Sequence, residues 1–303
     1  MNTRTLRADV LLFLTAAIWG LAFVAQRVGM EHVGPLTFNG IRFALGALAL
    51  VPLTLVLEKR RASGLIGVDR RRTIVGGGLL GLALFIGASL QQIGLAGPQL
   101  AGFGLEASTA GKAGFITGLY VVLVPLFGLF LAQRPGWGTW VGAALAVTGM
   151  YLLSVTSGLA ISFGDLLVFI GAFFWAGHVL LVGKLSPGLD AVDAVKLSAI
   201  QFAVCAVLSL VGAAATEEAT LAGIAGAGPA ILYGGLMSVG VAYTLQIIAQ
   251  RDAQPAHAAI ILSLESVFAA IGGWLMLGEV LTARGLTGCA LMLAGMLLSQ
   301  LKP

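Results

Sequence analysis

Long apolar stretches separated by short polar breaks are the dominant pattern along this chain. Most stretches hold about 20 residues, the length that a helix needs to cross the hydrocarbon core of a bilayer. The breaks are rich in glycine, proline and charged residues, as expected for turns at a membrane surface. The pattern predicts ten transmembrane helices with approximate limits 9–29, 36–57, 73–95, 107–131, 137–155, 163–184, 192–214, 228–249, 255–277 and 284–301.

The composition agrees with an all-α integral membrane protein. Apolar residues make up 58% of the 303 residues and charged residues 10%, whereas a soluble domain of this length needs more polar surface. Cys205 and Cys289 both lie inside apolar stretches and suggest no disulfide framework. Arg4 and Arg7 precede the first apolar stretch, as in a signal peptide, but no convincing A-x-A cleavage site follows. We therefore interpret that stretch as the first helix.

The distribution of charge predicts an orientation. Most of the 17 lysines and arginines fall on one side of the predicted membrane, at the N-terminus, in the 58–72 break and in the C-terminal tail, whereas the opposite breaks hold mainly glutamates. By the positive-inside rule, we expect a multi-pass protein of the cell inner membrane with both termini in the cytoplasm. Orientation thus explains the net charge of +4, and we expect lipids and a small-molecule substrate as partners, but neither nucleic acid nor an obligate protein partner.

Two echoes in the sequence predict an internal repeat. DVLLFLTAAIW (9–19) and DLLVFIGAFFW (165–175) share Asp, Leu, Phe, Ala and Trp at the same positions, and small and apolar residues of 142–152 recur in 288–298. We predict two five-helix halves, 9–155 and 163–301. Because five is odd, the second half would enter the membrane from the opposite side. Such inverted repeats are typical of secondary transporters, in which one central site opens to either side in turn.

TAGKAGFITGLYVVLVP (109–125) and SLESVFAAIGGWLMLGE (263–279) resemble the EamA family of the drug/metabolite transporter (DMT) superfamily. The resemblance covers about residues 9–301. It implies a ten-helix bundle with a central cavity that exports small metabolites, and amino acid exporters similar to YddG are the best-known bacterial branch. Ser266 departs from the family pattern, since many relatives carry proline there, and the 96–107 link looks longer than usual.

Ionisable residues inside a membrane are costly, so each is a candidate functional residue. Lys112 lies about 8 Å from the outer end of helix 107–131, at 1.5 Å per residue. It either snorkels to the outer headgroups or lines the outer mouth of the cavity, where a substrate carboxylate or phosphate would pair with it. Glu265 lies near the midplane and must be protonated, paired or facing water. It is a candidate proton carrier or ligand for a substrate amine, or else a structural residue bonded to neighbouring helices.

Amides and aromatic residues complete the predicted substrate-binding site. Gln91 and Gln92 are adjacent and cannot face the same way on a helix, so we expect one to line the cavity and the other to pack against a neighbour. Trp19 and Trp175 occupy matched positions deep in the two halves, where they either form apolar walls for a substrate or pack between the halves. Weaker candidates are Tyr120, Tyr243 and His178, of which the histidine is more often a packing residue than a proton relay.

Four further charged residues have plain structural interpretations. Asp9 and Asp165 match between the halves and begin helices, where a carboxylate caps exposed N–H groups and suits the helix dipole. Arg27 and Arg42 fall near the outer ends of their helices, where snorkelling or an ion pair with Glu31 explains them.

These observations predict a secondary transporter that exports small metabolites, foremost amino acids with aromatic or other apolar side chains, by alternating access. No nucleotide-binding motif is present, so we expect no cofactor and no direct use of ATP. Coupling to protons through Glu265 and facilitated transport both stay open. The main alternative is a transporter of phosphorylated or nucleotide-linked sugars, which needs several cations such as Arg27, Arg42 and Lys112. The chain contains no HExxH, GxSxG or Asp-rich metal motif, which disfavours an intramembrane enzyme.

Overall fold

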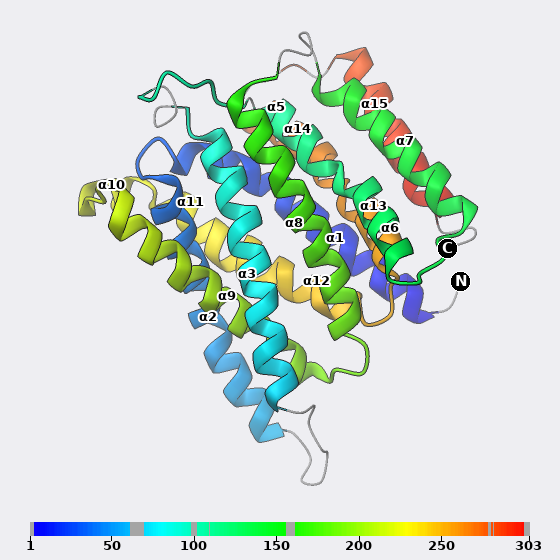
Figure 1. Ribbon diagram of the computed structural model, residues 1–303, viewed down its shortest axis with the longest axis horizontal. Coiled ribbons are helices and arrows are strands. Elements are labelled where there is room, and N and C mark those ends of the chain that lie inside the picture. The colour runs from blue at the N-terminus through cyan, green and yellow to red at the C-terminus, as the bar shows by residue number, and fades with distance from the viewer. Residues whose placement is uncertain are drawn as a thin grey trace.

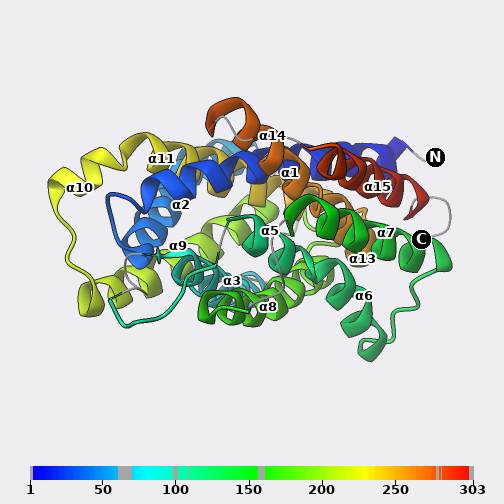
Figure 2. The ribbon, with the colours of Figure 1, turned by 90° about the horizontal axis from the view of Figure 1, so that it is seen from above.

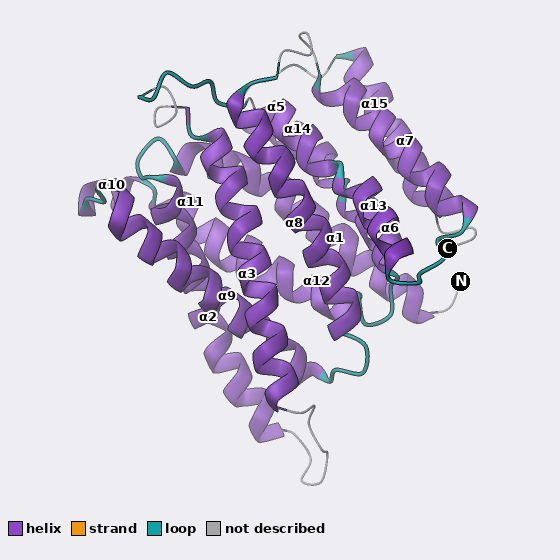
Figure 3. Ribbon diagram, viewed as in Figure 1, coloured by secondary structure: helices purple, strands orange, loops and turns teal. Residues whose placement is uncertain are grey.

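The computed structural model describes residues 3–60, 70–97, 102–108, 110–155, 161–277, 280 and 282–299. Within these ranges it does not describe the side chains of 70, 110–112 and 277. Every regular element in the described part of the chain is a helix, and no strand occurs there (Figures 1 and 3).

The first half of the chain supplies five helical segments that follow the predicted ones. They are α1 (Thr3–Gly29), α2 (Pro35–Arg60), α3 (Arg70–Leu95), the pair α5 (Ala110–Gly118) and α6 (Tyr120–Phe130), and α7 (Trp137–Ser154). The first segment begins at Thr3 and not at 9. The fourth segment begins at Ala110 and not at 107, because 102–108 form turns and loop.

The second half repeats this order with more interruptions. Its elements are α8 (Phe163–Leu185), α9 (Ala191–Thr216), the short α10 (Leu221–Gly226), then α11 (Gly228–Leu232), the π-helix η1 (Tyr233–Tyr243) and α12 (Thr244–Ala249) in one continuous rod, the pair α13 (Pro255–Leu262) and α14 (Glu265–Leu277), and α15 (Ala283–Ser299).

Eight helical segments of the described chain are long and apolar enough to cross a membrane. They make this a multi-pass membrane protein. The two remaining predicted spans are α15, which has 17 residues, and α7, which has 18 residues but carries polar and aromatic side chains from threonine, tryptophan and tyrosine. The number of ten crossings therefore stays a prediction.

The fourth helix of each half is broken near its middle, which the sequence did not predict. In the first half, α5 ends at Gly118 and α6 begins at Tyr120. In the second half, Ser263 and Leu264 separate α13 from α14. Ser263 Oγ donates to the carbonyl of Ile260 at 2.8 Å, and such back-bonding by serine bends helices. The two breaks place Tyr120 and Glu265 at the first position of a half-helix.

The helices form two outer pairs, and between them helices of the first half pack against helices of the second half. Figures 1 and 2 show α2 beside α9 at one end of the molecule and α7 beside α15 at the other. Between them, α1 packs against η1 and α14, whereas α8 packs against α3, α5 and α6. Each half thus supplies a first helix that packs mainly against helices of the opposite half, and buried core residues lie between α1 and α8.

Glycines allow α7 and α15 to cross closely. A Cβ atom added at Gly142 would lie 2.7 Å from the carbonyl oxygen of Gly295, and one added at Gly149 would lie 2.4 Å from that of Gly288. The reverse substitutions at Gly288 and Gly295 meet the same partners. Because the earlier glycine of α7 meets the later one of α15, the two helices run antiparallel. Small residues at such crossings are typical of membrane helix packing.

Candidate functional site

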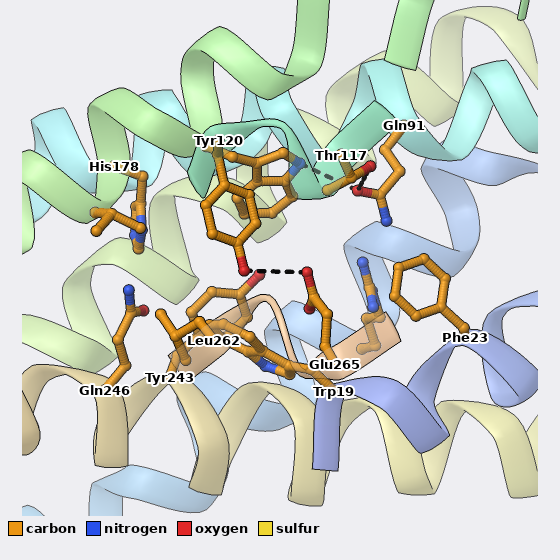
Figure 4. Close-up of a pocket in the computed structure, with 13 residues that line it drawn as sticks. Trp19, Phe23, Gln91, Thr117, Tyr120, His178, Tyr243, Gln246, Leu262 and Glu265 are labelled. Carbon is orange, nitrogen blue, oxygen red and sulfur yellow. Dashed lines mark hydrogen bonds between the residues drawn. The ribbon is translucent and has the colours of Figure 1, made fainter. Parts of the chain in front are cut away.

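A cavity lies in the middle of the bundle, where helices of both halves meet. Figure 4 shows the side chains that line it. Aromatic rings form much of the wall, from Trp19, Phe23, Tyr120, Trp175 and Tyr243. The polar lining comes from Arg42, Gln91, Thr117, His178, Gln246 and Glu265. Sequence reasoning named most of these residues, whereas Phe23, Thr117 and Gln246 carry no feature that marks them in the sequence.

The hydrogen bond between Tyr120 and Glu265 joins the two broken helices across the cavity. The Tyr120 hydroxyl donates to one oxygen of Glu265 at 3.2 Å (Figure 4). Both side chains are buried. Because the breaks put Tyr120 at the start of α6 and Glu265 at the start of α14, this contact links one half of the chain to the other. Sequence reasoning expected a partner, water or a proton for Glu265, but did not identify Tyr120 as that partner.

The two matched tryptophans both line the cavity, but their indole N–H groups find different acceptors. Trp19 donates to the backbone carbonyl of Ser238 in η1 at 3.1 Å. Trp175 donates to Oε1 of Gln91 in α3 at 3.1 Å. Each tryptophan thus reaches the third helix of the opposite half. The rings also contact Tyr243, which stacks on Trp175 with an interplanar angle of 19° and centroids 6.5 Å apart.

The structure separates the two adjacent glutamines. Gln91 lines the cavity and also accepts a hydrogen bond from Thr117 at 3.3 Å. Gln92 is fully buried outside the cavity lining, and neither of its amide atoms has a hydrogen-bond partner among the described residues. Of the two substrate-binding candidates, Gln91 is thus the one that faces the cavity and Gln92 the one that packs, because successive helix positions point in directions about 100° apart.

His178 lies at the edge of the cavity, against a polar neighbour. Its Nε2 lies 2.9 Å from Oε1 of Gln201, and its ring meets the Tyr243 ring edge-on at 5.9 Å between centroids. The side chain is buried. These contacts match the expected packing role and hold the histidine beside Tyr243 (Figure 4).

Arg42 is the main departure from the sequence-based expectation. It was expected to snorkel, but it is 5% exposed and lines the cavity. Its Nε donates to Oδ1 of Asn39 at 3.1 Å. The guanidinium lies over two rings, 4.9 Å from the centroid of Phe43 and 5.4 Å from that of Phe38. Depth along a helix does not reveal which face a side chain takes, and this arginine faces inward.

Lys112 was the predicted cation of the outer mouth. Its backbone belongs to α5, but its side chain lies outside the described part of the structure. A role of Lys112 at the outer mouth of the cavity therefore stays a prediction.

Asp9 does not cap a helix, contrary to the expectation. Because α1 already begins at Thr3, Asp9 lies inside it, and its Oδ1 lies 2.8 Å from Nε2 of His257. The other ring nitrogen lies 2.9 Å from Oγ of Ser299. This contact joins α1, α13 and α15 at one end of the bundle. Asp165 does cap, in a box with Ser162.

The chain forms a multi-pass helical bundle with a polar and aromatic cavity at its centre, and broken helices from both halves line this cavity. This is the architecture of a membrane transporter. The described residues contain no group of three or more His, Cys, Asp or Glu placed to hold a metal ion.

Comparison with known proteins defines the family. The model of the EamA-like transporter family matches the chain over residues 6–155 and again over 162–301. The chain therefore belongs to this family and has its two-repeat fold.

Relatives extend over nearly the whole chain. An uncharacterised transporter of Archaeoglobus fulgidus is 29% identical over 99% of this chain and 88% of its own length. The uncharacterised transporter YoaV of Bacillus subtilis is 25% identical over 93% and 92%. The uncharacterised inner membrane transporter YedA of Escherichia coli is 25% identical over 89% and 83%. A crystal structure with 17% identity superposes with a TM-score of 0.75 over 97% of this chain and 96% of that one, which supports the fold alone.

Proposed function

We propose that this protein is a secondary transporter that exports small metabolites, foremost amino acids with aromatic or other apolar side chains, across the inner membrane by alternating access. The observation that carries this proposal is the composition of the central cavity. Stacked aromatic rings offer an apolar wall. In the same cavity, Gln91 adds an amide, Arg42 a guanidinium and Glu265 a carboxyl group. An amino acid could place an apolar side chain against the rings and its ammonium and carboxylate groups against the polar side chains.

Alternating access requires two halves that can exchange roles, and the α7–α15 crossing supports such a pair. Gly142 and Gly149 are the counterparts of Gly288 and Gly295 in the sequence echo. Each glycine of α7 meets the counterpart of the other one, which is the reciprocal contact that a two-fold axis produces. Since the two helices are antiparallel, that axis runs across them, as an inverted repeat requires.

The broken helices also support a central site. Discontinuous helices in corresponding positions of two repeats mark the substrate site in many transporters. Here the fourth helix of each half is broken, and the two breaks meet through Tyr120 and Glu265.

The proposed orientation has both termini in the cytoplasm, from the positive-inside rule. An inner membrane location agrees with that of the E. coli relative YedA, which is named as an inner membrane transporter. A reporter that is active only in the cytoplasm, fused to the C-terminus, is expected to be active. Activity of a periplasm-specific reporter at the same site would contradict this orientation.

The experiment that tests the function is counterflow in liposomes. The purified protein is reconstituted, and exchange of a panel of radiolabelled amino acids is measured with and without an imposed pH gradient. Saturable exchange of one group of amino acids supports the proposal. Accumulation that needs the gradient and is lost in Glu265→Gln would assign proton coupling to Glu265, whereas equal exchange without a gradient would indicate a facilitator.

Failure of every amino acid in the panel would contradict the proposed substrate class. Phosphorylated sugars would then be tested next. They are the weaker candidate because Arg42 is the one cation among the described side chains that line the cavity, whereas a phosphate with about two negative charges favours several basic partners.

A further inference from the structure

Arg42 is held in a fixed orientation by neutral neighbours. Asn39 accepts a hydrogen bond from Nε, and the rings of Phe38 and Phe43 flank the guanidinium. These contacts use only one of its three nitrogens. The two terminal nitrogens have no hydrogen-bond partner among the residues that the structure describes, although the side chain is 5% exposed and lines the cavity.

A buried arginine in this setting lacks a counter-ion. An arginine side chain stays charged in proteins, and a buried charge without a partner is strongly unfavourable. No carboxylate of the described chain lies in ion-pair distance of Arg42. The ion pairs of Lys196 with Glu58 and of His257 with Asp9 do not involve Arg42. The free end of the planar fork fits a carboxylate, which it can bind through two parallel hydrogen bonds.

Glu265 places a carboxyl group in the same cavity but forms no ion pair with Arg42 in the described structure. Its described partner is the Tyr120 hydroxyl, and it comes from α14 in the second half, whereas Arg42 comes from α2 in the first. Tyr243 packs against Trp19, with ring centroids 4.5 Å apart, and against Phe43 beside Arg42, at 6.2 Å. The cavity thus holds a guanidinium and a carboxyl group from different halves, with aromatic rings beside them.

We propose that Arg42 is the carboxylate-binding residue of the transport site, and that Arg42 and Glu265 together select substrates that carry a carboxylate and an ammonium on one small apolar molecule. This inference rests on the proposed function and specifies how its site recognises a substrate. A molecule that carries only a carboxylate or only an ammonium leaves Glu265 or Arg42 without its ligand, so it binds less well.

The experiment compares a substrate with analogues that lack one charge. The amino acid with the strongest counterflow serves as the reference. For phenylalanine, the analogues are 3-phenylpropionate, which has no ammonium, and phenethylamine, which has no carboxylate. Each competes against labelled substrate in proteoliposomes. For the wild type we expect each analogue to compete about ten- to a hundredfold less well than the amino acid, because each lacks hydrogen bonds to a charged group.

The variants then assign each charge to its residue. Arg42→Gln is expected to lose most of its preference for phenylalanine over phenethylamine but to keep its preference over 3-phenylpropionate. Glu265→Gln is expected to show the reverse. Arg42→Lys keeps the positive charge and should preserve part of the carboxylate preference, which provides a second measurement if Arg42→Gln does not fold. Arg72→Gln, at an exposed arginine of α3, is the matched control and should leave both preferences unchanged.

A uniform loss of competition by all three ligands in Arg42→Gln and Arg42→Lys would show that Arg42 only packs, and would overturn this inference while counterflow itself stands. Absence of counterflow by the folded wild type for every amino acid would overturn the proposed function together with the inference. The two failures are therefore distinguishable.

Discussion

Asp9 and Asp165 occupy matched positions in the two halves, but the structure uses them differently. Asp165 completes a capping box with Ser162 and accepts a hydrogen bond from Ser108 at 2.6 Å, which joins α8 to the segment before α5. Asp9 instead contacts the imidazole of His257, which joins α1 to α13. Asp9 thus links the first helix of its half to the fourth helix of the other half, whereas Asp165 links α8 to the loop that precedes the fourth helix of the first half. The Asp9 link contains a second titratable group, the imidazole of His257.

The third helices differ in a similar way. In the first half, α3 is a regular helix, and the tryptophan that reaches it bonds to a side chain, Gln91. In the second half, the corresponding stretch includes η1, and Trp19 bonds to a backbone carbonyl there. A carbonyl oxygen can accept a second hydrogen bond through its other lone pair. The two matched tryptophans therefore reach the same helix of the opposite half but use different chemical groups as acceptors.

The largest difference between the halves is expected at the aspartate links. His257→Ala leaves the buried Asp9 carboxylate without its cationic or hydrogen-bonding partner, and removal of one member of a buried pair costs about 3–5 kcal/mol. Ser108→Ala removes one hydrogen bond from Asp165, which keeps its capping contacts, and should cost about 1 kcal/mol. Chemical unfolding in detergent micelles measures both values.

His32→Ala is the control for this comparison, because that histidine is exposed, and we expect almost no change in its unfolding free energy. Equal losses for His257→Ala and Ser108→Ala would show that the two links are equivalent after all.

A smaller effect is expected at the crossing of α7 and α15, and it should be equal in the two halves. Gly149→Ala and Gly288→Ala each bring a methyl group to 2.4 Å from the opposing carbonyl oxygen, so each should lose about 1–3 kcal/mol of unfolding free energy through overpacking. Gly78→Ala in α3 meets no atom within 4 Å and should be neutral or slightly stabilising. Clearly unequal losses at Gly149 and Gly288 would argue against a two-fold relation.

The smallest effect is expected at the tryptophan acceptors. Gln91→Ala removes the acceptor of Trp175, so the concentration for half-maximal counterflow should rise about three- to tenfold. Ser238→Ala keeps the backbone carbonyl that Trp19 uses, so it should match the wild type. The concentration dependence of counterflow measures both. A similar rise in the two variants would mean that these hydrogen bonds do not position the rings.

Local properties of the sequence determined the helical class, the positions of most helices and the family. Apolar stretches of membrane length form helices in lipid because every backbone group must bond within its own segment. The same reasoning singled out Glu265, Trp19 and Trp175, since a midplane carboxylate and deep tryptophans are unusual wherever the neighbouring helices lie.

Tertiary structure decided which side chains meet. Arg42 was misplaced, and the choice between Gln91 and Gln92 stayed open, because the sequence gives the depth of a residue, whereas the rotation of its helix depends on packing against distant segments. His257 became the partner of Asp9 across 248 positions, and Tyr120 that of Glu265 across 145. No local pattern marks such pairs. They arise because hydrogen bonds and buried charges are satisfied by whichever helices the packing of the whole bundle brings together.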